Sequence, residues 1–268
     1  MEIKIRPVFF AMALSLGVVC PGHAEDAPPL VRAHAHNDYE HARPLLDAME
    51  RKFCSIEADI HLASGKLLVA HDAKSVRPDR TLEKLYLQPL REQILRNGGR
   101  VYRGGPSVIL LVDVKTEREA TYAALRAVLK SYSDILTKFE GDRIETNAIT
   151  VIISGNVAKV SMSREKSRLA ACDGHLAGLG METQPALFPL LSEEWKTYFE
   201  WNGEGEISPE ERRQLRAFVA AAHRNGRRLR FWGTADSPAV WRELWQADVD
   251  LIGADDLDAL EKFLRALQ

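Results

Sequence analysis

The stretch VILLVDVK, residues 108–115, decides the fold. Six of its first seven residues are apolar, and such a continuous run is typical of a parallel strand buried on both faces. Short runs of the same kind recur along the chain and alternate with amphipathic segments. We expect eight strands, at Leu30–Ala35, Ser55–Ile60, Val108–Val114, Ala148–Ile153, Leu169–Asp173, Leu187–Leu191, Leu229–Trp232 and Val249–Gly253.

The segments between these runs have helical periodicity. We expect helices at Pro44–Lys52, Glu119–Tyr132, from Ser208 to Gly226, Ser237–Gln246 and from Leu257 onward. Eight strand–helix units in about 240 residues predict an α/β fold, a single-domain (β/α)₈ TIM barrel. A doubly wound open sheet would need a glycine-rich phosphate loop after its first strand, whereas HNDY stands at residues 36–39.

The N-terminal segment differs in composition from the rest. Lys4 and Arg6 precede twelve mostly apolar residues, 8–19, and the small residues Gly22 and Ala24 follow. This order predicts a secretory signal peptide over residues 1–24, cleaved after Ala24, and hence a periplasmic or secreted location. A retained membrane anchor is the alternative. The barrel domain is then expected to span residues 25–268.

Charge and cysteine content narrow the function classes. The 268-residue chain has a net charge of −2, with 36 basic and 38 acidic residues. Such a balance argues against a nucleic-acid-binding protein, which needs a basic surface. Beyond residue 24, Cys54 and Cys172 are the two cysteines. Both lie in apolar runs with no sign that they meet, so we expect two buried free thiols.

Polar residues spaced by two stand at the carboxyl ends of four predicted strands. Side chains alternate along a strand, and the active sites of TIM barrels form at the carboxyl ends of the strands. We therefore expect these residues to converge on one cavity: His34 and His36, Glu57 and Asp59, Asp113 and Lys115, and Arg230 and Trp232.

Three acidic residues of this set are candidate metal ligands. Glu57, Asp59 and Asp113 offer carboxylate oxygens without a nearby cysteine, the ligands that one Mg²⁺ or Ca²⁺ prefers. A divalent cation held there would offset the charge of a phosphate in the transition state. The alternative is that the carboxylates simply pair with Lys115 and Arg230.

Two histidines that bracket the acidic pair are candidate catalytic groups. His36 and His71 are the expected acid–base pair, since imidazole titrates near neutral pH, and Asp72 either orients His71 or caps a turn. Substrate binding is expected from Lys115, Arg230, Trp232, Asn37 and His34. Trp232 fits a pocket wall and a core position equally well. The aromatic loop 193–207 is interpreted as a substrate lid or, more simply, as packed loop aromatics.

These motifs resemble the glycerophosphodiester phosphodiesterase and phosphatidylinositol-specific phospholipase C-like superfamily. That superfamily has a first-strand histidine, Glu-x-Asp on strand two, a following His-Asp, and an acidic residue two positions before a lysine on strand three. Here the same order is given by His36, Glu57-Ala-Asp59, His71-Asp72 and Asp113-Val-Lys115. The segments HNDYEHARPLLDA and SIEADIHLASGKLLVAHD resemble those of a secreted bacterial branch that is related to the fungal altered inheritance of mitochondria protein 6. VIISGN, CDG and RFWGTAD extend the resemblance.

The resemblance implies a metal-dependent phosphodiesterase with two histidines as general base and acid. In related enzymes a neighbouring hydroxyl of the substrate attacks phosphorus to give a cyclic phosphate, which water then opens. The substrate would be a small-molecule or lipid phosphodiester, with transient contact to a membrane surface. Two glycerophosphodiesterase signatures, His-Arg-Gly and Glu-Asn-Thr, are missing, and Asp113 replaces the usual glutamate. The resemblance thus supports the metal and histidine core rather than glycerol recognition.

Two other functions fit parts of the pattern. His-x-His on the first strand and Asp255 at the end of the last are also found in zinc amidohydrolases and histidinol-phosphatase-like barrels. Those enzymes need further histidines on strands five and six, and here only His175 follows strand five. The other alternative is a barrel that binds a phospho-ligand without turning it over. The sequence does not indicate the oligomeric state.

Overall fold

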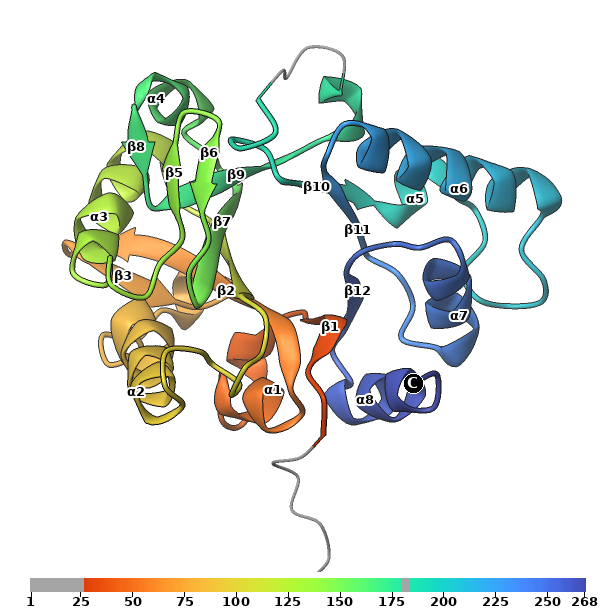
Figure 1. Cartoon of the computed structure of the whole chain (residues 1–268), viewed down its shortest axis with the longest axis horizontal. Helices are drawn as coiled ribbons and strands as arrows, with labels where there is room; N and C mark the ends of the chain where they lie inside the picture. Colours follow the sequence, from red (N-terminus) through yellow and green to blue (C-terminus); the bar gives the residue numbers. More distant parts are fainter. Residues whose placement is uncertain (1–26, 180–183) are drawn as a thin grey trace, which may run out of the picture.

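The computed structural model describes residues 27–179 and 184–268, and these form a nearly closed barrel of eight parallel strands (Figure 1). The barrel strands are β1 (Leu30–Ala35), β2 (Phe53–Ala63), β4 (Val108–Val114), β7 (Ile149–Gly155), β9 (Ala170–Gly174), β10 (Leu190–Glu194), β11 (Arg228–Trp232) and β12 (Ile252–Ala254). Their order is β11-β10-β9-β7-β4-β2-β1-β12. A parallel bridge between Arg230 and Leu251 joins the two ends. The predicted TIM barrel is confirmed.

Helices cover the outside of the barrel (Figure 1). They are α1 (Leu46–Glu50), α2 (Gln88–Arg96), α3 (Arg118–Lys130), α4 (Lys159–Arg164), α5 (Trp195–Tyr198), α6 (Pro209–Arg224), α7 (Pro238–Gln246) and α8 (Leu257–Arg265). The start of α6 follows from its sequence, because the Ser208 side chain accepts a hydrogen bond from the Glu211 backbone N–H. Short helical turns lie at η2 (Asp38–Glu40), η3 (Ala73–Ser75), η4 (Glu83–Leu87) and η5 (Leu176–Gly178).

Several elements differ from the predictions. The sixth barrel strand is Leu190–Glu194 rather than Leu187–Leu191, because the Leu187 carbonyl accepts a hydrogen bond from the Cys172 N–H before the strand begins. The first helix is only Leu46–Glu50. The segment β3 (Lys66–Val69) runs antiparallel to β2.

A small accessory sheet, not predicted, lies beside α3 (Figure 1). It is formed by β5 (Lys138–Glu140), β6 (Arg143–Glu145) and β8 (Ser167–Arg168), in the order β6-β5-β8. These strands have two or three residues each and carry mostly exposed side chains, so they lack the apolar run that marks the barrel strands.

The hydrophobic core has two parts, inside and outside the barrel. The large outer part packs strands against helices. A small inner cluster is made of Ile109, Leu111, Ile152, Leu190 and Leu251. Since side chains alternate along a strand, residues two or four positions further on, at the carboxyl ends, face the same interior. The apolar cluster is therefore the floor beneath the polar residues of the barrel mouth.

The loop from Glu193 to Ile207 packs into the outer core. Trp195 and Phe199 are each 3% exposed, their rings stack at 4.1 Å, and both meet Phe231 edge-on. The packed-aromatics interpretation is confirmed, and the substrate lid is wrong. Cys54 and Cys172 are buried, and neither forms a disulfide within the described residues, as predicted.

No helix within residues 27–179 and 184–268 is both long and apolar enough to cross a membrane. The signal peptide predicted for residues 1–24 lies outside the described residues.

Candidate active site

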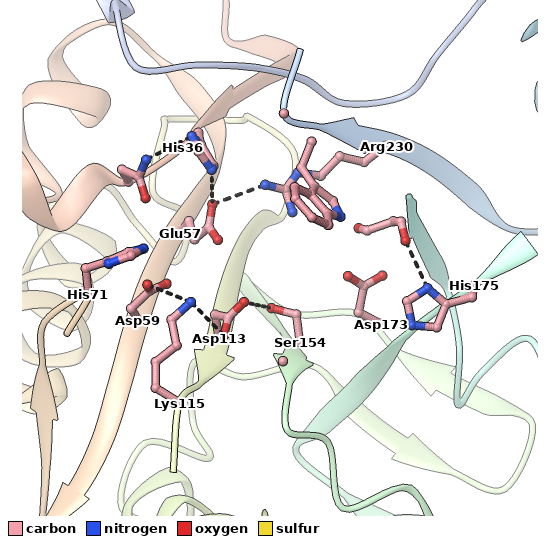
Figure 2. A pocket seen from close by; sticks show the side chains of 15 residues that line it. His36, Glu57, Asp59, His71, Asp113, Lys115, Ser154, Asp173, His175 and Arg230 are labelled. Carbon is pink, nitrogen blue, oxygen red and sulfur yellow. Dashed lines mark hydrogen bonds and ion pairs between the residues drawn. The ribbon is translucent and has the colours of Figure 1, made fainter. Parts of the chain in front are cut away.

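A cavity of about 480 Å³ opens at the carboxyl ends of the barrel strands (Figure 2). Nine of the ten predicted site residues line it: His36, Asn37, Glu57, Asp59, His71, Asp113, Lys115, Arg230 and Trp232. They come from five different segments of the chain, and the barrel brings them together. The single exception is His34.

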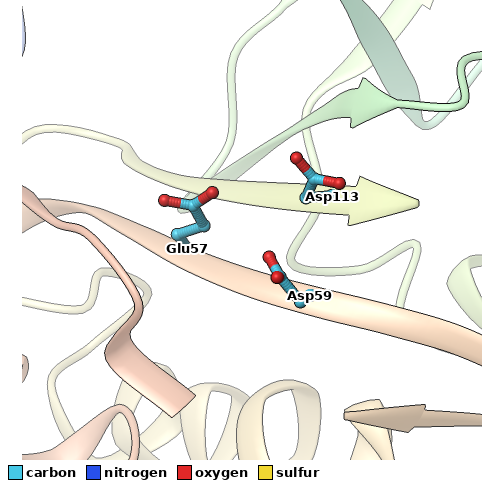
Figure 3. A group of neighbouring side chains, drawn as sticks. All are labelled: Glu57, Asp59 and Asp113. Carbon is cyan, nitrogen blue, oxygen red and sulfur yellow. The ribbon is translucent and has the colours of Figure 1, made fainter. Parts of the chain in front are cut away.

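Three carboxylates lie side by side on β2 and β4 (Figure 3). The parallel register pairs Asp59 with Asp113, and one oxygen each of Glu57, Asp59 and Asp113 lies within 4.8 Å of the others. The Asp59 Oδ1 atom is buried and has no hydrogen-bond partner among the described residues. An all-oxygen set with an unsatisfied oxygen fits a hard divalent cation. Zinc sites usually contain histidine or cysteine, and no histidine belongs to this group in the described chain.

Two cationic side chains hold the carboxylates together. Lys115 Nζ lies 2.9 Å from Asp59 Oδ2 and 3.2 Å from Asp113 Oδ1. Arg230 Nη2 lies 3.1 Å from Glu57 Oε2. The ion pairs considered as an alternative to metal binding are therefore present, and they leave Asp59 Oδ1 unpaired.

The environment separates the pKa values of the carboxylates. Burial raises the pKa of Asp59 to about 6, although Lys115 opposes the rise. Burial also disfavours the charged form of Glu57, but Arg230 and His34 outweigh it and hold the pKa of that carboxyl well below its usual range. Glu57 is therefore charged at neutral pH, whereas Asp59 still titrates just below neutral pH and nearby positive charge favours its charged form.

His36 is held by a carboxylate that the sequence analysis did not place in the site. Its Nδ1 lies 2.8 Å from Asp255 Oδ1, and Asn37 Nδ2 donates to the same oxygen at 3.2 Å. Asp236 fixes Asp255 in turn, because its Oδ2 accepts from the Asp255 N–H at 2.7 Å. Burial lowers the pKa of His36, but the hydrogen bond to Asp255 and the charge of Glu57 outweigh it, so the pKa is raised.

His71 lies at the rim of the cavity, on the far side of the carboxylates from Arg230 (Figure 2). Its side chain is 57% exposed, and its Nδ1 is 3.5 Å from Asp72 Oδ1. The backbone is fixed by neighbours, since the His71 carbonyl accepts from His61 Nε2 at 3.1 Å. The imidazole ring of His71 is thus exposed to solvent, while the backbone of the residue is held in place.

His34 is completely buried and does not line the cavity, so the structure does not place it with the other nine predicted site residues. Its Nε2 is 3.2 Å from Glu57 Oε2, and its Nδ1 is 2.7 Å from Ser55 Oγ. Burial, helped by the charge of Arg230, lowers the pKa of His34 to about 4. Because a carboxylate only accepts, neutral His34 donates from Nε2 and orients Glu57.

The wall opposite His36 and His71 contains polar residues that were not predicted as site residues: Ser154, Asp173 and His175 (Figure 2). Ser192, also not predicted, lines the same cavity. Burial raises the pKa of Asp173 to about 7, against the opposing effects of Ser192 and Arg230. Ser192 lies beside Asp173, but Asp173 Oδ1 and Ser192 Oγ form no well-aligned hydrogen bond in the described chain. The alternation that identified Asp113 also applies to Asp173 and could have found it.

A family model for the AIM6-like phosphodiesterase domain matches residues 24–170, more than half of the chain. The chain belongs to this family. The match includes His36, His71 and the three carboxylates, and it confirms the family resemblance drawn from those motifs.

The chain has curated relatives in fungi. Altered inheritance of mitochondria protein 6 of Eremothecium gossypii is 30% identical, over 89% of this chain and 70% of that protein. The homologue of Arthroderma benhamiae is 26% identical, over 87% of this chain and 83% of that protein. The predicted periplasmic or secreted location is wrong, because these relatives are fungal proteins named for the inheritance of mitochondria, not bacterial periplasmic proteins.

Solved structures support the fold of the family. A glycerophosphodiester phosphodiesterase from Parabacteroides distasonis has a TM-score of 0.57 and 17% identity, covering 90% of this chain and 99% of that one. One from Agrobacterium tumefaciens has a TM-score of 0.53 and 15% identity, covering 88% and 100%. At these identities the similarity shows the barrel alone.

Proposed function

We propose that this chain is a phosphoric diester hydrolase and that its reaction takes place in the barrel-mouth cavity. The observation that carries the proposal is the group of three carboxylates, with Asp59 Oδ1 unpaired, in the same cavity as His36 and His71. Membership of a phosphodiesterase family supports the same reaction class. The substrate is a small-molecule or lipid phosphodiester, and lipid substrates require transient contact with a membrane surface.

Glu57, Asp59 and Asp113 hold one divalent cation, Mg²⁺ or Ca²⁺. Such a cation, when bound, neutralises charge that develops on phosphoryl oxygens. Lys115 and Arg230 supply fixed positive charge at the same place. The cation also favours the charged form of Asp59, whose carboxyl otherwise has a pKa of about 6.

His36 and His71 divide the proton transfers. His36, whose pKa is raised, is the general acid, because it retains its proton to higher pH than an ordinary histidine and the Asp255 carboxylate stabilises its cation. The more exposed His71 is the general base. It takes the proton of the attacking hydroxyl, that oxygen bonds to phosphorus, and the P–O bond to the leaving group breaks. The leaving oxygen receives the His36 proton.

The attacking hydroxyl belongs either to the substrate or to water. Attack by a neighbouring substrate hydroxyl gives a cyclic phosphate, and water then opens the ring with the two histidines in exchanged roles. The wall of Asp173 and Ser192 binds the polar part of the substrate, because these two neighbouring buried groups form no well-aligned hydrogen bond in the described chain.

The roles of His36 as general acid and His71 as general base are tested by how the activity of each variant depends on the leaving group. The leaving oxygen of a p-nitrophenyl diester needs little protonation, whereas that of an alkyl diester needs it fully. His36→Ala is expected to lose about 10²–10⁴-fold in kcat on alkyl diesters and much less on bis-p-nitrophenyl phosphate. His71→Ala is expected to lose similarly on both.

Steady-state hydrolysis of both diester classes is the measurement. His223→Ala is the matched control, since His223 pairs with Asp250 outside the cavity. Full activity in both the His36 and the His71 variant would refute the proposal. Equal losses on the two substrate classes in His36→Ala would refute its role as the acid.

A further inference from the structure

A second cavity, of about 310 Å³, lies between α3 and the accessory sheet. It shares no residue with the barrel-mouth cavity, and α3, β5 and β8 lie on the outside of the barrel (Figure 1). Its size falls within the range of small-molecule sites, roughly 300–1,000 Å³. The proposed phosphodiesterase reaction gives this cavity no role.

A buried arginine lines this second cavity. Arg168, on β8, is 4% exposed. Its Nη2 donates to the Ala186 carbonyl at 3.4 Å, and its Nε has no partner in the described residues. Its guanidinium also lies over the Phe139 ring, 5.8 Å from the centroid. A buried cation without an anionic partner is costly, so a ligand that supplies the anion is favoured there.

Further positive charge lies around Arg168. Lys130 on α3 and Lys138 on β5 are exposed and line the same cavity. Neither lysine nor Arg168 forms an ion pair with another described residue. Of the remaining charged residues of the lining, Arg126 and Glu165 pair with each other at 3.5 Å, and Glu140 is exposed.

The rest of the lining is partly apolar. Tyr122, Leu129 and Leu169 contribute to the walls, and Tyr122 and Leu129 are buried. An inorganic anion would leave these surfaces without a partner, whereas an anion with a small organic group covers them.

We propose that this cavity is a second binding site, for a small organic phosphate monoester. The phosphate oxygens pair with the Arg168 guanidinium and with the rim lysines Lys130 and Lys138, and the organic group contacts Tyr122 and Leu129. Three cations without carboxylate partners match a dianionic phosphate better than a singly charged carboxylate, and the planar guanidinium suits phosphate geometry. The proposal does not depend on the catalytic role of the barrel mouth.

Calorimetric titration with phenyl phosphate, at constant ionic strength and with a chelator present, tests the site. Lys138→Glu and Arg168→Met are expected to weaken binding at least about tenfold. Lys66→Glu is the matched control, because Lys66 is an exposed lysine on β3 outside both cavities, and it is expected to bind as the wild type does. Lys115→Met, which alters the barrel mouth, is expected to retain this binding.

Comparison of three ligands shows which chemical group the cavity binds. Phenyl phosphate is expected to bind more tightly than inorganic phosphate and than benzoate. Equal binding of benzoate would overturn the phosphate assignment. Any of three results would overturn the proposal of a site in this cavity. These are loss of all phenyl phosphate binding in Lys115→Met, wild-type affinity in Lys138→Glu, and no binding by the wild type at millimolar concentration. Lys138 is exposed, so its variant keeps the test valid if Arg168→Met does not fold.

Discussion

His36 and Asp255 form the contact that most directly tunes the proposed chemistry. Asp255 raises the pKa of His36, so the protonated general acid persists to higher pH. Asp255→Asn keeps an acceptor oxygen but removes the charge. We expect the alkaline limb of the kcat/KM profile to move to lower pH, with reduced kcat on alkyl diesters.

A pH–rate profile of the purified variant checks this expectation. Asp72→Asn is the matched control, because Asp72 lies beside His71 rather than His36. An alkaline limb that stays in place in Asp255→Asn would contradict the role of His36 as the acid.

Asp38 is a buried carboxyl outside the catalytic set, and it links stability to pH. It is 0% exposed, and its Oδ2 accepts from the Leu45 N–H and from the Tyr86 hydroxyl. Burial raises the pKa of Asp38 to about 6. The folded state therefore binds the proton more tightly than the unfolded state, and stability falls as the pH rises from about 4 to 6, by up to roughly 2–3 kcal/mol.

Asp38→Asn removes the titrating group, so the unfolding free energy is expected to decline less over this pH range. Urea unfolding at several pH values between 4 and 7 measures the difference. Asp142→Asn changes an exposed aspartate and serves as the control. If the wild type and Asp38→Asn show the same decline, burial of a charged Asp38 is not its cause.

The residues that sequence reasoning found and missed differ in one physical respect. Glu57, Asp59 and Asp113 end long apolar runs, so alternation along the strand identifies their side. Asp255 follows a strand of only three residues and lies 219 positions from His36, so only the closed barrel brings them together. His34 lies two positions before His36 and therefore faces the same side of the strand, but it is buried one layer deeper, beneath Glu57.

At the scale of elements, local sequence signals decided most boundaries. Val108–Val114 was predicted without error, and the start of α6 follows from Ser208 and Pro209. The accessory sheet was missed because Arg143–Glu145 is fully exposed and is held by pairing to β5 rather than by burial. The start of β10 depends on a contact with Cys172 that the local sequence does not contain.

The cap of α6 gives a prediction at this scale. The Ser208 hydroxyl accepts from the Glu211 N–H at 3.1 Å, and its Oγ also lies 3.0 Å from Glu211 Oε2. Ser208→Ala removes both contacts and is expected to lower the free energy of unfolding by about 1 kcal/mol, with unchanged kcat.

Chemical unfolding of this variant is compared with Ser163→Ala, whose exposed hydroxyl donates to the Val160 carbonyl within α4. A loss in Ser208→Ala no larger than in this control would show that the cap does not stabilise α6.

At the scale of the whole molecule, the closed barrel turns five separate segments into one site. The inner apolar cluster forms the floor, the carboxylates and their cationic partners line the cavity above it, and the two histidines are more exposed than the carboxylates. The order of strands makes β2 and β4 direct neighbours, which places Asp59 opposite Asp113. The alternation of strands and helices was sufficient to predict this architecture, but not the composition of the wall on β9 and β10.

Phosphorus NMR of the full chain with a panel of glycerophosphodiesters, lysophospholipids and phosphoinositides tests the central claim most directly. With Mg²⁺ or Ca²⁺ we expect a diester resonance to give way to a monoester or cyclic phosphate, and chelator to stop the change. Asp113→Asn is expected to slow it at least about a hundredfold, and the exposed Asp79→Asn is expected to leave it unchanged. Turnover that persists in chelator, or no turnover of any diester with either cation, would contradict the account.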